Sequence, residues 1–227
     1  MQTAAVIRNP TLQRIPAAVL MRGTTLLRPA VTGQSRRLAR GEELFAEGDA
    51  AEFFYKVVAG SIRSAKLLSD GRRQIDAFHL AGDIFGLEAG REHRFTAEAL
   101  EDTTVLAFRR SRLAELTSGD AAFAEEVMTA MMSSLERAQE HMLTLGRKTA
   151  LEKIASFLLD MADRLVGGGG HVDLPMQRAD IADHLGLTIE TVSRTLTQLA
   201  RDGLIGLTAG SRSVDLRNLA ALRLLQA

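Results

Sequence analysis

The chain has 227 residues, with 28 basic and 28 acidic side chains and no cysteine. The lack of cysteine excludes disulfides, thiolate-bound zinc and cysteine-ligated iron–sulfur clusters. No apolar run is long enough to span a bilayer, so we expect a cytoplasmic protein. The zero net charge gives no general electrostatic support for a nucleic-acid partner, so DNA binding has to be argued from local arrangements of residues.

The first segment, residues 1–37, is rich in arginine. The first 40 residues contain seven Arg and no acidic side chain. This composition superficially matches a transit peptide. The simpler interpretation, which we favour, is a basic arm that leads into the first domain.

The second segment, residues 38–119, is predicted to form a small β-rich domain. Short apolar strands are separated by glycines at close intervals, which is typical of a roll or a sandwich. Asp70-Gly71 lies between two alternating runs and indicates a tight hairpin at that point.

The third segment, residues 120–146, is predicted to be one long helix. Apolar residues recur in it with alternating steps of four and three, the 3.5-residue period of a coiled coil. This seam consists of Ala124, Met128, Met131, Leu135, Ala138, Met142 and Leu145. The seam could pack on its own β-domain, but the unbroken heptads favour a second copy of the same helix, and hence a parallel homodimer.

The last segment, residues 147–227, is predicted to hold a helix to about Val166, a linker at Gly167–Gly170 and then a helix–turn–helix. Gly186 supplies the sharp turn, Thr188 caps the second helix, and Ile181 and Leu185 line the apolar face of the first helix. The second helix carries its own apolar stripe, formed by Val192, Leu196 and Leu199.

The opposite face of that second helix predicts DNA recognition. Glu190, Ser193 and Arg194 project together, and such a helix fits the major groove with its first turns nearest the bases. Arg binds guanine O6 and N7 with two donors, while Glu accepts from the cytosine amino group. An ordinary helical hairpin with a solvated face is the alternative. Short strands on both sides of the two helices favour a winged DNA-binding domain instead.

This order of segments resembles the cAMP receptor protein/Fnr family of bacterial transcription regulators from about residue 38 to the end. The residues that carry the resemblance are the helix–turn–helix together with Gly41-Glu42, Glu47-Gly-Asp49, Gly60, Asp70-Gly-Arg72, Gly82-Asp-Ile-Phe-Gly86 and Ala97-Glu-Ala99. The Glu190, Ser193 and Arg194 set resembles that of the Fnr and FixK branch of the family. The resemblance implies an α+β fold: a double-stranded β-helix (jelly-roll, cyclic-nucleotide-binding-like) barrel, a long dimerisation helix and a winged helix–turn–helix.

The same resemblance implies a function and further sites. A homodimeric activator would bind a TTGA-N6-TCAA-like palindrome and recruit RNA polymerase, in microaerobic, respiratory or nitrogen-fixation gene control. The Arg164–Gly170 loop lies where the family has its main activating surface. The residues at the family's phosphate-contacting positions are Gln177, Arg178, Thr188 and Thr191.

A small-molecule effector is not expected, so we predict no cofactor. The cyclic-nucleotide-binding segment of the family is shortened in this chain: Arg94 is retained, Phe95 replaces the hydroxyl partner, and Glu88 is displaced by one position. His79 and His93 are conceivable haem ligands, although lone histidines in such a domain are usually structural. A regulator of the same family gated by cyclic nucleotide or haem remains the alternative. An enzyme is not expected, because the sequence shows no nucleophile–base pair, metal cluster or phosphate loop.

Overall fold

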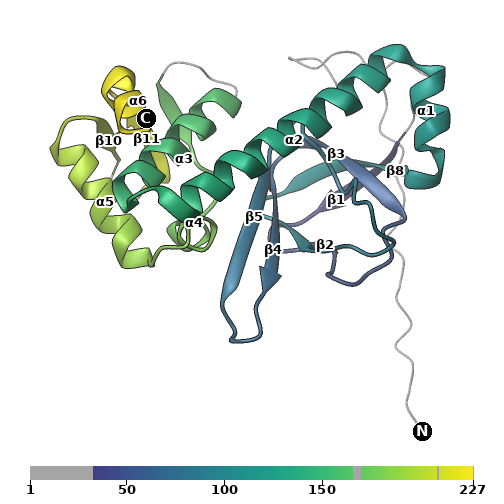
Figure 1. Ribbon diagram of the computed structural model, residues 1–227, viewed down its shortest axis with the longest axis horizontal. Coiled ribbons are helices and arrows are strands. Elements are labelled where there is room, and N and C mark those ends of the chain that lie inside the picture. The colour runs from purple at the N-terminus through teal and green to yellow at the C-terminus, as the bar shows by residue number, and fades with distance from the viewer. Residues whose placement is uncertain (1–32, 166–169, 209, 227) are drawn as a thin grey trace, which may run out of the picture.

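The computed structural model describes residues 33–165, 170–208 and 210–226. A β-barrel (residues 33–109) and a helical C-terminal domain are joined along one long helix, α2 (Figure 1). This architecture confirms the α+β fold predicted from the sequence. Most of the basic arm and most of the glycine linker lie outside the described residues. None of the described helices could span a lipid bilayer.

The barrel consists of two four-stranded antiparallel sheets that face each other across an apolar core. The strand orders are β1-β8-β3-β6 and β2-β7-β4-β5. Val57, Ile62, Ala97 and Val105 are fully buried between them. The strands are β1 (Gln34–Leu38), β2 (Glu43–Phe45), β3 (Phe53–Ala59), β4 (Ile62–Leu67), β5 (Arg73–His79), β6 (Ile84–Phe85), β7 (Thr96–Ala99) and β8 (Thr103–Arg109).

The barrel begins earlier in the chain than the sequence indicated. Strand β1 starts at Gln34, inside the segment expected to be a basic arm, and pairs with β8 from Gln34 opposite Ala107 to Leu38 opposite Thr103. It is an edge strand held mainly by backbone hydrogen bonds, and only Leu38 in it is fully buried. Polar and basic side chains are common on such edges, so composition alone could not reveal the strand.

The hairpin predicted at Asp70-Gly71 is present. It joins β4 to β5, and Gly71 adopts a φ of 84°, in the left-handed region that favours glycine. The N–H of Leu68 donates to the carbonyl of Arg72 at 2.7 Å and closes the turn. Arg72 and Asp70 form an ion pair at the exposed tip.

Helix α2 (Ala121–Arg147) follows a single 3₁₀ turn (Arg110–Arg112) and the short helix α1 (Leu113–Gly119). The side chain of Asp120 caps its start by accepting the N–H groups of Ala122 and Phe123. Phe123 and Val127 pack against Phe54 and Phe108 of the barrel. The helix continues one residue past Gly146, which was expected to end it.

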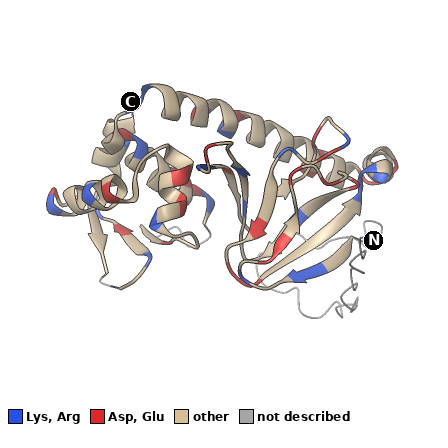
Figure 2. Cartoon of the chain, turned by 90° about the horizontal axis from the view of Figure 1, so that it is seen from below, with Lys and Arg blue, Asp and Glu red and all other residues tan. Residues whose placement is uncertain are grey.

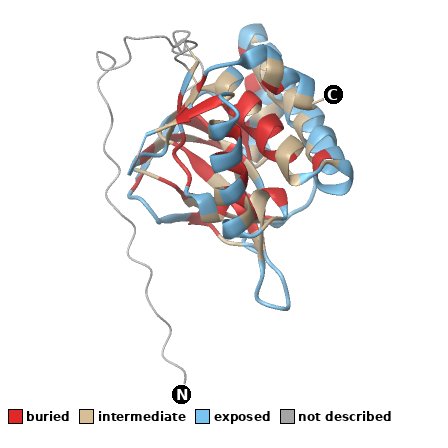
Figure 3. Cartoon of the chain, turned by 90° about the vertical axis from the view of Figure 1, so that its left-hand side faces the viewer, coloured by how far each residue is buried: buried red, intermediate tan, exposed pale blue. Residues whose placement is uncertain are grey.

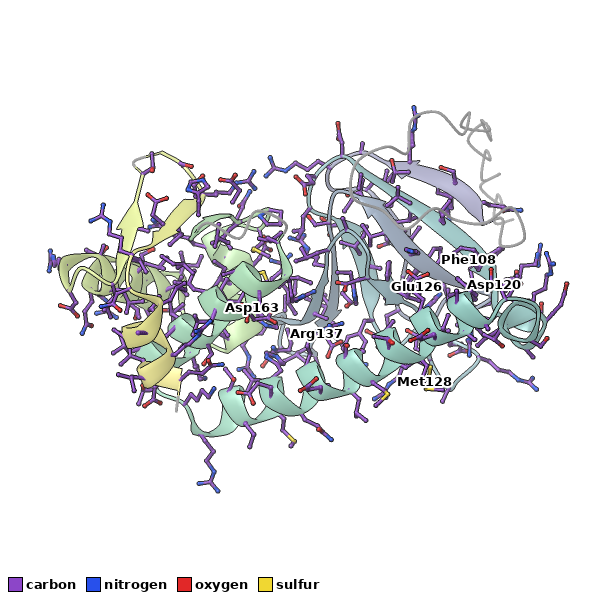
Figure 4. The ribbon with its side chains drawn as sticks, turned by 90° about the horizontal axis from the view of Figure 1, so that it is seen from above. Phe108, Asp120, Glu126, Met128, Arg137 and Asp163 are labelled. Atoms are coloured by element: carbon purple, nitrogen blue, oxygen red, sulfur yellow. The ribbon has the colours of Figure 1, made fainter. Side chains whose placement is uncertain are left out.

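The apolar seam of α2 faces away from the barrel. Met128, Leu135 and Met142 are 58%, 62% and 66% exposed, and Figure 4 shows Met128 on the outer side of the helix. Glu126, on the opposite side, forms an ion pair with Lys56 of β3. In this structure the seam is therefore available to another molecule, and packing on its own barrel does not account for it.

The C-terminal domain has helices around a small three-stranded sheet. Its elements are α3 (Ala150–Arg164), β9 (His171–Asp173), α4 (Arg178–Leu185), α5 (Ile189–Arg201), β10 (Ile205–Leu207), β11 (Ser213–Leu216) and α6 (Leu219–Gln226). The strand order is β10-β11-β9. Helix α6 was not predicted from the sequence; it buries Leu222 and packs against α3. Figure 3, viewed from this domain, shows the buried residues gathered on the inner faces of its helices.

His184, in the last turn of α4, should make the protein less stable in mild acid. Burial lowers the pKa of His184 from 6.5 to about 3, and nearby His141 adds to the shift. Between these two values the unfolded chain binds a proton that the folded chain does not, so the free energy of unfolding falls as the pH decreases through this window. Urea denaturation at pH 7 and pH 5 measures the fall. His184→Asn, whose amide can still donate a hydrogen bond, should show a smaller fall; an equal fall would assign the acid sensitivity to other groups.

Candidate DNA-binding interface

Helices α4 and α5 form the helix–turn–helix that the sequence predicted. Gly186 follows α4 with a φ of 62°, and the hydroxyl of Thr188 accepts the N–H of Thr191 at 3.2 Å to cap α5. The expected stripe of α5, Val192, Leu196 and Leu199, is buried. Ile181, Ala182 and Leu185 of α4 are buried in the same apolar core. The angle between the two helices is therefore fixed by packing.

A lysine that the sequence analysis did not identify also holds this motif. The ammonium group of Lys153, on α3, donates to the carbonyl of Leu185 at 2.9 Å and is largely buried. A cation at the last carbonyls of α4 is favourably placed with respect to the helix dipole. Burial lowers the pKa of Lys153. Nothing in the sequence indicated this contact, because the two residues are 32 positions apart.

The three residues expected to read bases lie on the outer side of α5. Glu190 and Arg194 are exposed, while Ser193 is half-buried and accepts a hydrogen bond from Arg178 at 3.3 Å. In the described part of the chain, neither Glu190 nor Arg194 is held in an ion pair. Figure 2 shows basic and acidic residues interspersed on the helices of the C-terminal domain. A guanidinium and a carboxylate are thus presented to solvent one helical turn apart.

The carboxyl of Glu190 is favoured in its ionised form. Its own backbone N–H at the start of α5 and the Thr188 hydroxyl lower the pKa of Glu190, and Arg194 contributes less. An ionised carboxylate only accepts hydrogen bonds, which suits the amino group of a cytosine.

The residues expected to contact phosphates lie at the starts of the two helices. Gln177 and Arg178 begin α4, and Thr188 and Thr191 begin α5. All are exposed except Thr191, which is half-buried. Helix N-termini favour anions because their free N–H groups and dipoles point outward. The Thr188 hydroxyl already has a structural role as the cap.

Replacing Thr188 by Ala should lower the free energy of unfolding by about 1 kcal/mol, because an N–H in the first turn of α5 loses its acceptor. Urea denaturation measures this change. Thr197→Ala is the matched control: among the described residues its hydroxyl donates only to the carbonyl of Ser193, within the same helix. Surface changes of this kind usually stay within about 0.5 kcal/mol. Equal effects in the two variants would contradict the capping role.

The expected wing is present as the sheet of β9, β10 and β11. Val214 is buried between neighbours on both sides, and its register pairs it with Val172 and Leu207. On the exposed face, His171 bonds to Asp215 at 2.6 Å and to Asp173 at 3.2 Å. The hydrogen bond that His171 donates to the Asp215 carboxylate is the main cause that raises the pKa of His171. The sequence analysis did not identify this polar cluster.

The residues considered for an effector in the barrel already have partners there. His93 bonds to Glu88 through Nδ1 at 2.7 Å and stacks on Phe45. His79 bonds to Ser64 at 2.8 Å and stacks on Phe85, and burial lowers its pKa to about 4. Each of the two histidines thus has a polar partner and an aromatic neighbour within the barrel. Arg94 is exposed and Phe95 is half-buried.

Arg164 was expected at the start of the exposed activating loop, but in the structure it contacts the barrel. It is the last residue of α3 and donates to the carbonyl of Phe78 at 2.6 Å and to Asp83 at 2.8 Å. A third hydrogen bond reaches Asp160 of the same helix. Its guanidinium therefore fastens α3 to the barrel. Residues 166–169 of the expected activating loop lie outside the described residues.

Comparison with known proteins agrees with this geometry. Residues 152–225 match the family "Crp-like helix-turn-helix domain", and residues 35–120 match "Cyclic nucleotide-binding domain". The chain is 45% identical to the nitrogen fixation regulation protein FixK of Rhizobium meliloti, over 81% of this chain and 82% of that protein. It is 48% identical to FixK of Azorhizobium caulinodans, over 86% and 79% of the respective chains. The solved structure of FixK2 from Bradyrhizobium japonicum matches with a TM-score of 0.80 and 48% identity, covering 87% of this chain and 98% of that one.

Proposed function

The chain belongs to the Crp/Fnr family of transcription regulators, in its FixK branch, and from this premise we propose that it is a homodimeric activator that binds a TTGA-N6-TCAA-like palindrome. The observation that carries this proposal is the free outer face of α5, with Glu190 and Arg194 exposed one turn apart. In a half-site, Arg194 would bind guanine and Glu190 the paired cytosine, while Ser193 would meet the neighbouring thymine.

The exposed seam of α2 supports a parallel dimer. Met128, Met131, Leu135, Ala138, Met142 and Leu145 are all exposed. Such a row on one helix loses its contact with water when a second copy packs against it. A two-fold symmetric dimer then matches a palindrome whose half-sites are one helical turn apart.

Control without an obligatory small ligand is the third part of the proposal. Its support is that His79 and His93 are engaged in barrel contacts and that Arg94 lacks the hydroxyl partner of the cyclic-nucleotide pattern. The protein would then recruit RNA polymerase once bound, in nitrogen-fixation or low-oxygen gene control. By the family resemblance, the segment that follows Arg164, up to Gly170, would offer the contact surface.

Selection of bound fragments from a random DNA pool, without added ligand, tests the proposal. The expected result is enrichment of an inverted TTGA repeat by purified protein alone. Enrichment that requires cAMP or cGMP would instead favour the ligand-gated alternative, and calorimetry with each nucleotide would measure their binding. An absorbance scan of the purified protein tests for haem. Failure to enrich any motif under all of these conditions would contradict sequence-specific binding.

A further inference from the structure

The helix–turn–helix is fastened to the barrel of its own subunit at strand β5. His184, in the last turn of α4, bonds through Nδ1 to the carbonyl of Ile75 at 3.1 Å, and the amide of Gln74 donates to the carbonyl of His184 at 3.2 Å. Phe78 of the same strand lies 5.1 Å from the His184 ring. Buried Ile75, Phe78 and Leu80 belong to the same apolar core as α3, α4 and α5.

Four charged residues add a second attachment beside this apolar contact. One oxygen of Asp180, on α4, accepts from Arg63 at 2.6 Å and from Arg73 at 2.8 Å, and its other oxygen accepts the N–H of Gln177. Arg73 also donates to Asp183 at 2.8 Å. We call Arg63, Arg73, Asp180 and Asp183 the hairpin clamp, because both arginines come from the β4–β5 hairpin.

The centre of the clamp, Asp180 with Arg63, is buried, whereas the side chains of Arg73 and Asp183 are each 31% exposed. The side chain of Asp180 is 5% exposed and that of Arg63 15% exposed. A buried carboxylate is tolerated only when hydrogen-bonded partners replace the water that it has lost, and removing one partner is costly. Asp180 therefore holds α4 in one position relative to the hairpin.

Helix α2, the proposed dimer helix, also packs against this barrel. Phe123 and Val127 of α2 pack on the barrel, and Arg137 approaches Asp83 at 3.9 Å. Figure 4 shows Arg137 on the side of α2 that faces the barrel and the C-terminal domain. The barrel thus connects α2 to the helix–turn–helix that contains α5. In the chain itself, only Lys148 and Thr149 separate α2 from α3.

We propose that the hairpin clamp determines which spacing between half-sites the dimer accepts. This inference rests on the proposed binding of a palindrome by a dimer. One added base pair moves a half-site by about 3.4 Å and rotates it by about a tenth of a turn. A loosely attached helix–turn–helix would follow that movement, whereas a clamped one loses contact with one half-site. Arg63, Arg73, Asp180 and Asp183 are therefore positioning residues for spacing specificity, although they do not read bases.

The test uses duplexes in which TTGA and TCAA are separated by five, six or seven base pairs. Wild-type protein should prefer the six-base-pair spacer by roughly tenfold or more, since loss of one half-site removes several base contacts. Arg73→Glu places a carboxylate against Asp180 and Asp183 and should reduce this preference to about threefold or less. The preference between spacers is the decisive readout, because a merely structural role would weaken binding to all three duplexes equally.

Arg72→Glu is the matched control. It makes the same change one residue away, at the exposed tip of the hairpin. Among the described residues the arginine there pairs only with Asp70, so this variant should keep the wild-type preference. If circular dichroism shows that Arg73→Glu is unfolded, Arg73→Ala replaces it, since Asp180 then keeps Arg63. A folded variant at position 73 that discriminates spacers as the wild type does would overturn the inference.

The outcomes also separate this inference from the proposed function. A wild-type protein that binds none of the three duplexes would contradict the palindrome itself. A wild-type protein that binds all three equally would leave palindrome recognition standing and refute the clamp as the determinant of spacing.

Discussion

Arg194→Ala should weaken binding to the cognate palindrome by roughly 1–3 kcal/mol per half-site and remove discrimination at a single base pair. Arg194 is exposed on α5, so its loss should not disturb the fold. The guanidinium can donate two parallel hydrogen bonds to guanine O6 and N7, and no other base pair presents that pair of acceptors in the same place. Titration of duplexes with each of the four base pairs at that position measures the effect.

Two further variants sharpen the Arg194 prediction. Arg201→Ala removes the same charge from the exposed end of α5 and should weaken binding to all duplexes about equally, because it changes only the general attraction to phosphates. Arg194→Lys keeps the charge but not the planar pair of donors, so it should also lose discrimination. If Arg194→Ala affected every sequence to the same extent as Arg201→Ala, Arg194 would be a phosphate contact and not a base reader.

Leu135→Glu should convert the proposed dimer to a monomer and reduce palindrome affinity by roughly 100-fold or more, since the second half-site no longer benefits from a tethered partner. Leu135 is 62% exposed in the single chain, so the substitution leaves the monomer core intact. In a parallel dimer, two unpaired carboxylates would meet at the seam and lose their water. Met131→Glu should act in the same way.

Sedimentation velocity measures the oligomeric state of these variants. Thr129→Glu is the matched control, because it adds the same charge to an exposed position next to Met128 but outside the heptad positions of the seam. It should remain a dimer with wild-type affinity. A dimer that survives Leu135→Glu would show that the chain associates through another surface.

The variants at Arg194, Leu135 and Arg73 test three separate properties of the proposed dimer. In these proposals Arg194 would read a base, Leu135 would hold two copies of α5 in one dimer, and Arg73 would fix the distance between them. Each variant therefore has its own signature, in base discrimination, in oligomeric state or in spacer preference.

The sequence by itself determined the parts of this protein that depend on local periodicity. The stripe of Val192, Leu196 and Leu199, the turn at Gly186 and the cap at Thr188 follow from the rise and pitch of an α-helix and from glycine stereochemistry. The outward face of α5 followed from the same rule, because residues three and four apart lie together. The heptad of α2 likewise indicated a face that the barrel leaves exposed.

Only the tertiary structure decided how these parts are held relative to one another. Asp180 and Arg63 are 117 positions apart, and Lys153 reaches a carbonyl 32 positions away. Strand β1 forms only because β8 offers it a partner, and Arg164 turned out to be an anchor of α3 and not part of an exposed loop. Such contacts depend on where distant segments meet, and a charged residue has the same local sequence signal whether it faces water or a buried partner. Periodicity therefore predicted the exposed face of α5, while the contacts that position this helix came from long-range packing and ion pairs.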